Sequence, residues 1–312
     1  MRHARLVATL LGASALLAFL ACSSTPTKST VRPADDDDGD DTPPPSTTPD
    51  TPSDPVQDDG GKPPGRVFAH TADTLYLFDP LASTLTRIGS FDCFENSIDR
   101  MLDIAVDASG NMFGTSDFGF LSISTTDAKC RYITQSGTFP NSLGFVPVGT
   151  VDAAKEALVG YAFDVKGNAT RYVRIDPATG QISDLGSINP AGAAKQFSAA
   201  GDVIGLSRNG NRAYVTVKEL LTDGGTAPGK TNSLAEIDPK TGAIKTVLPE
   251  TGVTELFGLG QWAGQAYGFS GSGAIVAVSL ETGASRTLAG LDAGADASWF
   301  GAGVTTTAPT AP

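Results

Sequence analysis

The chain has 312 residues, a formal net charge of −12 at pH 7 and only 18% charged residues. A protein that binds nucleic acid needs a basic patch for the phosphates, and no such patch is visible, so the composition argues against a nucleic-acid partner. The 36 glycines, with apolar residues spread evenly between them, are typical of many short strands joined by tight turns.

Residues 1–22 have the pattern of an export signal. Arg2 and Arg5 precede an apolar stretch, Leu6 to Leu20, that is too short for a membrane span. The stretch ends in Phe19-Leu20-Ala21-Cys22, which resembles the bacterial lipobox, although Phe19 departs from the usual Leu. The resemblance implies a lipid on Cys22, and Ser23 after it implies transport to the outer membrane, facing the periplasm or the cell surface. The alternative is an ordinary cleaved signal with a chance Cys.

Residues 23–65 form an acidic linker. They contain ten Asp against three basic residues, with the runs Asp35–Asp38 and Pro43–Pro45. Such a segment buries too little apolar surface to offset its ordering entropy, so we predict a disordered tether. Calcium or partner binding by the Asp run is the alternative. Residues 305–312 are predicted to be a short disordered tail.

A turn of the type Asp-Pro-x-Thr-Gly recurs after apolar strands. Asp caps such a turn through its side chain, Pro fixes φ, and Gly takes the positive-φ position. Full copies or weaker ones occur at Phe78–Pro80, Ile175–Gly180, Ile237–Gly242 and Val278–Gly283.

Two further strand types, rich in small residues, precede this turn in each unit. One includes Met112–Ser116 and the other includes Ile104–Val106, so a unit is a four-stranded meander of about forty to sixty residues, as in a propeller blade. The first unit lacks its opening strand, and residues 299–304 supply an orphan one. We therefore predict an all-β propeller over residues 66–304, most simply with five four-stranded blades and closed by pairing of residues 299–304 with 66–71. Six blades are the main alternative, because residues 218–232 could hide extra strands.

Ser207–Val217, followed by Leu234–Asp238, resembles the YVTN-type bacterial propeller repeat, a relative of NHL and quinoprotein-like propellers. The resemblance implies the propeller fold for residues 66–304. It does not choose between binding, scaffold and enzyme roles, all of which such propellers perform.

Cys93 and Cys130 form an even pair in a domain that we expect to be exported. Export favours a disulfide, which would join two neighbouring blades, and two separate buried thiols are the alternative. A metal site on these thiols is disfavoured because no His lies near them in the sequence.

Few residues suggest a reaction. His70 is the only histidine after the leader, and we interpret it as structural. Asp103 and Glu255 are the candidate acids for the central channel, where lactonase-like propeller hydrolases bind Ca²⁺, but one or two carboxylates are fewer than calcium requires. We therefore predict no catalytic residue and no metal site, and expect a membrane-tethered binding or scaffold lipoprotein without a cofactor. Its partner would be a protein, a glycan or the cell wall, first contacted by the long loop 220–232. The alternative is a calcium-dependent hydrolase with its site in the channel.

Overall fold

The repeated turn forms as its sequence predicts. In one copy, Asp176 Oδ1 accepts hydrogen bonds from the backbone N–H groups of Ala178 (2.8 Å) and Thr179 (3.2 Å). Gly180 closes the turn at φ 74°, a left-handed conformation that favours glycine. Asp238 caps its turn in the same way, so each copy ends one strand and starts the next.

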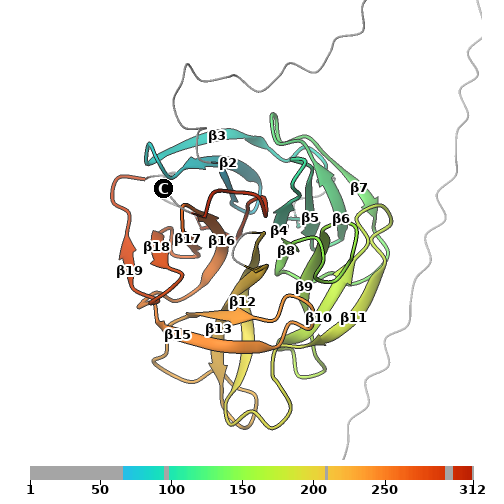
Figure 1. The fold of residues 1–312 in the computed structure, drawn as a ribbon. Coiled ribbons are helices and arrows are strands. Elements are labelled where there is room, and N and C mark those ends of the chain that lie inside the picture. The colour runs from blue at the N-terminus through green and yellow to red at the C-terminus, as the bar shows by residue number, and fades with distance from the viewer. Residues whose placement is uncertain (1–65, 95–97, 208–209, 292–297, 311–312) are drawn as a thin grey trace, which may run out of the picture. The chain divides into compact units, whose positions relative to one another are not determined.

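The computed structural model describes residues 66–94, 98–207, 210–291 and 298–310. The predicted leader with Cys22 and the linker 23–65 lie outside the described residues. Within the described residues, twenty strands form five four-stranded antiparallel sheets, arranged around a common axis as the blades of a propeller (Figure 1). The first blade contains β20 (Gly301–Gly303), β1 (Val67–His70), β2 (Thr74–Asp79) and β3 (Thr84–Ser90). The second contains β4 (Met101–Val106), β5 (Met112–Ser116), β6 (Gly119–Ile123) and β7 (Cys130–Thr134). The third contains β8 (Leu143–Val146), β9 (Ala157–Phe163), β10 (Ala169–Ile175) and β11 (Ile182–Ser187). The fourth contains β12 (Gln196–Leu206), β13 (Arg212–Leu220), β14 (Ser233–Ile237) and β15 (Ile244–Glu250). The fifth contains β16 (Leu256–Trp262), β17 (Gln265–Ser270), β18 (Ile275–Ser279) and β19 (Ser285–Thr287).

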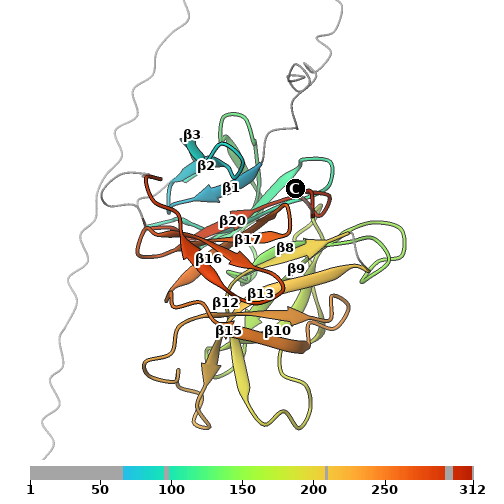
Figure 2. The same ribbon diagram turned by 60° about the vertical axis from the view of Figure 1, so that its left-hand side comes forward.

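The ring closes through the last strand. β20 pairs antiparallel with β1, with Gly301 opposite His70 and Gly303 opposite Phe68, and Figure 2 shows the two strands side by side. The five-bladed prediction is confirmed and the six-bladed alternative is wrong. The long stretch that suggested a sixth blade instead lengthens β13 and returns by a bridge between Leu220 and Thr226.

Neighbouring blades are joined by tyrosines that bind the repeated turn. Tyr161 and Tyr172 of the third blade are fully buried and donate to the carbonyl oxygens of Gly242 (2.5 Å) and Pro239 (2.9 Å). Both acceptors belong to the Asp238 turn of the fourth blade. The turn therefore has a second role, because two of its carbonyl oxygens satisfy buried hydroxyls of the preceding blade.

The C-terminal residues differ from their prediction. Residues 305–310 do not form a disordered tail: Thr306 is 1% exposed and Ala308 is 4% exposed. Thr306 O accepts from the backbone N–H (3.1 Å) and the hydroxyl (2.9 Å) of Ser207, and Gln261 Nε2 donates to Ala308 O (3.1 Å). Ser207 follows β12 and Gln261 lies near the end of β16, and both strands lie next to the axis of the propeller. Residues 305–310 therefore cover the end of the axis at which these strands finish. Among the described residues no helix could cross a bilayer.

Candidate ligand-binding funnel

The inner strands of the five blades leave little space at the axis. They are β20, β4, β8, β12 and β16, and they run in the same direction along it. A Cβ on Gly144 of β8 would overlap the carbonyl oxygen of Val203 on β12, so these two backbones are in direct contact. Small residues in the inner strands therefore serve close packing, and the middle of the axis is filled.

Two aspartates meet at this filled centre. Asp103 on β4 accepts from the backbone N–H groups of Ile104 (2.6 Å) and Leu143 (2.5 Å), the latter on β8. Asp202 on β12 accepts through Oδ2 from the N–H groups of Leu259 on β16 (2.8 Å) and Ala302 on β20 (2.6 Å). The two carboxyls are close enough to influence each other's pKa, and together they contact all five inner strands.

Burial raises the pKa of Asp103 well above its usual range, and the neighbouring Asp202 raises it further. Burial likewise raises the pKa of Asp202. Asp202 Oδ1 has no hydrogen-bond partner among the described residues. The raised pKa values favour one proton held between the two carboxyls, and that proton would give Asp202 Oδ1 a partner.

His70 lies beside this pair and is fully buried. Its Nδ1 is 2.8 Å from the carbonyl oxygen of Thr71, which places the ring proton on Nδ1 and leaves a lone pair on Nε2. The point where a Cβ of Gly301 would stand is 2.5 Å from Asp103 Oδ1 and 2.6 Å from His70 Nε2. Burial lowers the pKa of His70 to about 4, so the imidazole is neutral at neutral pH.

The carboxyl pair does not fit a calcium site. Calcium needs six to eight oxygen ligands with free lone pairs, whereas backbone N–H groups already point at three of these four carboxyl oxygens. Within the described residues no group of three or more His, Cys, Asp or Glu side chains could hold a metal. Asp103 thus lies at the axis, in the region where the sequence predicts it. There its carboxyl accepts backbone hydrogen bonds and contributes to the packing of the inner strands.

Above the pair, at the end where the inner strands begin, the structure has a cavity of about 550 Å³. We call it the funnel. Its floor contains Ser142 and Gly201, and the Ser142 hydroxyl donates to the carbonyl oxygen of Gly201 (2.7 Å). The next residues along the chain, Leu143 and Asp202, belong to the hydrogen-bond network of the two aspartates. All five inner strands, or the residues just before them, contribute to the wall. The residues that line the funnel include Arg100, Asn141, Phe163, Lys218, Thr226, Lys230, Thr254, Glu255, Phe257 and Phe300.

Glu255 is held at the rim of the funnel in a strained conformation. Its φ is 54°, which is uncommon for a residue with a side chain. Its carbonyl oxygen accepts from the N–H groups of Phe257 (2.9 Å) and Gly271 (2.8 Å), and these bonds keep it there. Backbone strain of this kind clusters at functional sites. The structure does not bring Glu255 together with Asp103, since Glu255 is exposed and Asp103 is buried beneath the floor.

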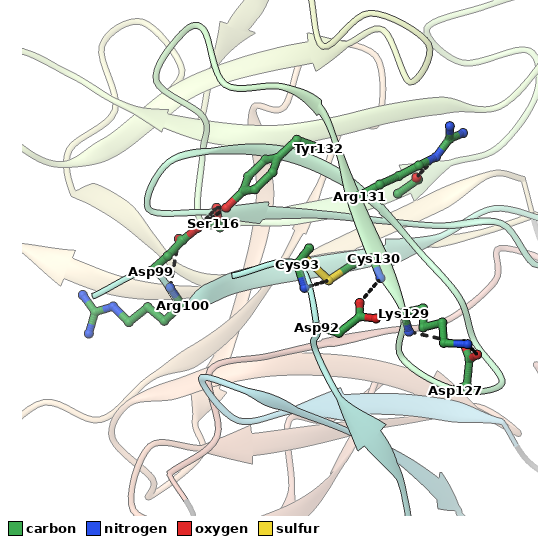
Figure 3. The surroundings of a disulfide bond; sticks show 11 residues. Asp92, Cys93, Asp99, Arg100, Ser116, Asp127, Lys129, Cys130, Arg131 and Tyr132 are labelled. Atoms are coloured by element: carbon green, nitrogen blue, oxygen red, sulfur yellow. Dashed lines mark hydrogen bonds and ion pairs between the residues drawn. A yellow bond between two sulfur atoms is a disulfide. The ribbon is translucent and has the colours of Figure 1, made fainter. Parts of the chain in front are cut away.

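Arg100 reaches the funnel from the connection between the first two blades. Its Nε donates to Asp117 (2.9 Å) and its guanidinium lies 5.5 Å from the centre of the Phe300 ring. The connection is fixed by the predicted disulfide between Cys93 and Cys130, which the structure confirms (Figure 3). The disulfide ties the connection to β7, the outer strand of the second blade.

A second contact group flanks the disulfide in Figure 3. Asp99, beside Arg100, accepts a short hydrogen bond from the Tyr132 hydroxyl, and the Ser116 hydroxyl lies 3.4 Å from the same carboxylate. The side of the funnel that holds Arg100 is therefore attached to the second blade at two places.

The sequence did not predict a role for Asp202, the position of His70 beside the two aspartates, or most of the residues that line the funnel. A signal for Asp202 exists, because it precedes the small-residue strand segment Val203–Leu206 as Asp103 precedes Ile104–Val106. The loop 220–232 was predicted to make contacts, and three of its residues, Thr226, Lys230 and Asn232, do line the funnel.

Comparisons with known proteins do not identify a family. No family model matches this chain, and no curated protein matches it in sequence. Among solved structures, a protein of unknown function from Bacteroides caccae, determined at 1.35 Å, aligns over 76% of this chain and 77% of its own. The identity is 10% and the TM-score is 0.37, a similarity from which no function follows. The assignment to the class of five-bladed β-propellers rests on the strand pairing described above.

Proposed function

We propose that this chain is a lipid-anchored, extracytoplasmic binding protein that holds its ligand in the funnel. The observation that carries the proposal is the difference between the two ends of the axis. One end is covered by the chain's own residues 305–310, and the other opens into a cavity of about 550 Å³, a size usual for small-ligand sites. Binding sites concentrate where loops meet on a rigid scaffold, which is the arrangement around the funnel.

The start of the propeller supports this orientation. β1 is antiparallel to β20, so Arg66 enters at the end that the tail covers. The point at which the chain enters the propeller therefore lies at the opposite end from the funnel. Lipidation of Cys22, the YVTN-type repeat and the outer-membrane location belong to this proposal and rest on the sequence patterns alone.

Binding without catalysis is favoured by the state of the reactive side chains. His70, the one histidine in the described part of the chain, is buried below the funnel and its Nδ1 is bonded to a backbone carbonyl. Cys93 and Cys130 are joined in a disulfide, so neither offers a thiolate. Among the described residues the funnel therefore has neither a histidine general base nor a cysteine thiolate.

The experiment compares two threonine variants of the full chain. Thr254→Trp puts a large ring into the funnel from an exposed position, and Thr246→Trp puts the same ring on the exposed outer strand β15. Soluble fragments of bacterial envelope polymers are titrated against both variants and the wild type, with the melting temperature as the readout. We expect ligands that stabilise the wild type to stabilise Thr246→Trp equally and Thr254→Trp much less. Equal stabilisation of all three proteins would contradict binding in the funnel.

A further inference from the structure

We infer that the funnel takes an acidic saccharide, a sugar that bears a carboxylate; this inference rests on the proposed function. The first observation is charge. The domain from Arg66 to the C-terminus carries 24 acidic and 17 basic residues. Among the described residues the funnel wall reverses this balance, with Arg100, Lys218 and Lys230 against one acid, Glu255. A cationic site in an acidic domain selects an anion by local contact.

Lys218 is the cation best placed to pair with a bound anion. Lys230 Nζ already contacts Glu250 (2.6 Å), and Arg100 uses Nε for Asp117. Among the described residues Lys218 has no ion-pair partner, and it is only partly exposed, on β13 opposite Ser198. A carboxylate at Lys218 would form a charge-assisted hydrogen bond, and the terminal guanidinium nitrogens of Arg100 add a second cationic group to the same wall.

The second observation is the combination of rings and small polar groups. Phe163 is 45% exposed at the funnel, and Phe257 and Phe300 also line it. Aromatic rings stack on flat apolar faces such as the C–H face of a pyranose. The exposed Asn141, Thr226 and Thr254 offer amide and hydroxyl groups that can bond sugar hydroxyls. An anionic group, an apolar face and several hydroxyls occur together in a uronic acid, and the cavity is large enough for about two sugar rings.

The test uses isothermal titration of the detergent-solubilised full chain with disaccharides of galacturonate, glucuronate and mannuronate. Each acid is paired with its methyl ester, which has the same ring and no charge. We expect at least one acid to bind about tenfold or more tightly than its ester, with an affinity that falls as salt rises. Lys218→Gln should lower the affinity for the acid toward that of its ester, so that the preference is lost. The control Lys245→Gln, an exposed lysine on β15, should behave like the wild type.

Two results overturn the inference. If the esters bind as well as the acids, or if no uronate in the set binds, the ligand class is wrong. Neither result touches the proposed function, which the Thr254→Trp and Thr246→Trp comparison decides with envelope fragments of any charge. If Lys218→Gln keeps the full preference for the acid, a uronate binds elsewhere and the assignment of Lys218 is wrong.

Discussion

Asp103 of β4 and Asp202 of β12 meet at the axis of the propeller. They accept hydrogen bonds from backbone N–H groups of β4, β8, β16 and β20, so the two residues and their donors include all five inner strands. In a closed ring of sheets, the inner edges of the inner strands have N–H groups that no neighbouring strand satisfies. A buried N–H without an acceptor is costly, so a carboxyl that accepts two of them stabilises the centre. The pair therefore stabilises the packing of the five inner strands at the axis.

Replacing Asp202 should separate the two roles of its carboxyl. Asp202→Ala leaves the N–H groups of Leu259 and Ala302 buried without an acceptor, and we expect the unfolding free energy to fall by about 2–6 kcal/mol. Asp202→Asn keeps one oxygen for these two donors and turns an amide NH₂ toward Asp103, where the shared proton was. We expect this variant to stay within about 1 kcal/mol of the wild type at neutral pH. Urea denaturation measures both, and equal losses in the two variants would contradict the proton-sharing arrangement.

The same pair predicts how stability depends on pH. Because the pKa of each folded-state carboxyl is raised above its usual 3.8, the folded protein holds more protons than the unfolded chain, and the unfolding free energy falls as pH rises through that window. His70 has the opposite sign, since its folded pKa is lowered from 6.5 to about 4 and its contribution is lost as pH falls between those values. The His70 contribution is the same in the wild type and in Asp202→Asn, so it cancels when the two are compared at each pH. We expect the unfolding free energy of the wild type to fall relative to that of Asp202→Asn as pH rises above 3.8, measured by urea denaturation at several pH values. Parallel curves for the two proteins would count against the assignment.

The features that the sequence predicts correctly are local. The Asp176 and Asp238 turns can be recognised because capping, proline and left-handed glycine act within five residues. Ring closure could be predicted because one strand was missing at the start and one was left over at the end. The Cys93–Cys130 disulfide could be predicted because two of the three cysteines remain for the exported domain once Cys22 is assigned to the lipid.

The features that were missed depend on contacts between distant segments. Asp202 lies in a bulge between Ala199 and Val203, so the strand pattern breaks where the carboxyl sits. Residues 305–310 have the composition of a disordered tail, and their order comes from Ser207 and Gln261 on other blades. The funnel is likewise formed by short segments from all five blades, and no local pattern marks its members.

Removing the disulfide should destabilise the propeller without opening it. The bond closes a loop with a sequence separation of 37 residues, for which loop entropy predicts about 3–4 kcal/mol if the bond is unstrained. We expect a Cys93→Ser, Cys130→Ser double variant to lose about this much in urea denaturation. The wild type in reducing buffer should match the double variant, and reductant should not change the variant further. A double variant as stable as the oxidised wild type would show that other contacts, such as that of Tyr132 with Asp99, are sufficient to hold the connection.

Close packing of the inner strands makes Gly144 sensitive to a single methyl group. A Cβ there would overlap Val203 O, which is backbone and cannot move aside as a side chain can. We expect Gly144→Ala to lower the unfolding free energy by about 1–3 kcal/mol. Gly225→Ala is the matched control, because the nearest atom to its Cβ would be a side-chain oxygen of Asp223 at 3.2 Å and not backbone, and it should change stability by less than about 0.5 kcal/mol. A Gly144→Ala protein as stable as this control would mean that the two backbones can separate freely.

The proposed lipid anchor predicts where in the cell the wild type and two variants are found. In a bacterium with two membranes, the wild type should incorporate labelled fatty acid and sediment with the outer membrane. Cys22→Ser removes the thiol that would carry the lipid, so this variant should lose the label. Ser23→Asp keeps that thiol and introduces the residue associated with retention in the inner membrane, so its label should remain while its position in a sucrose gradient shifts. The pair of variants separates lipidation from sorting: label retained by Cys22→Ser would refute the anchor, whereas an unshifted Ser23→Asp would refute only the predicted sorting signal.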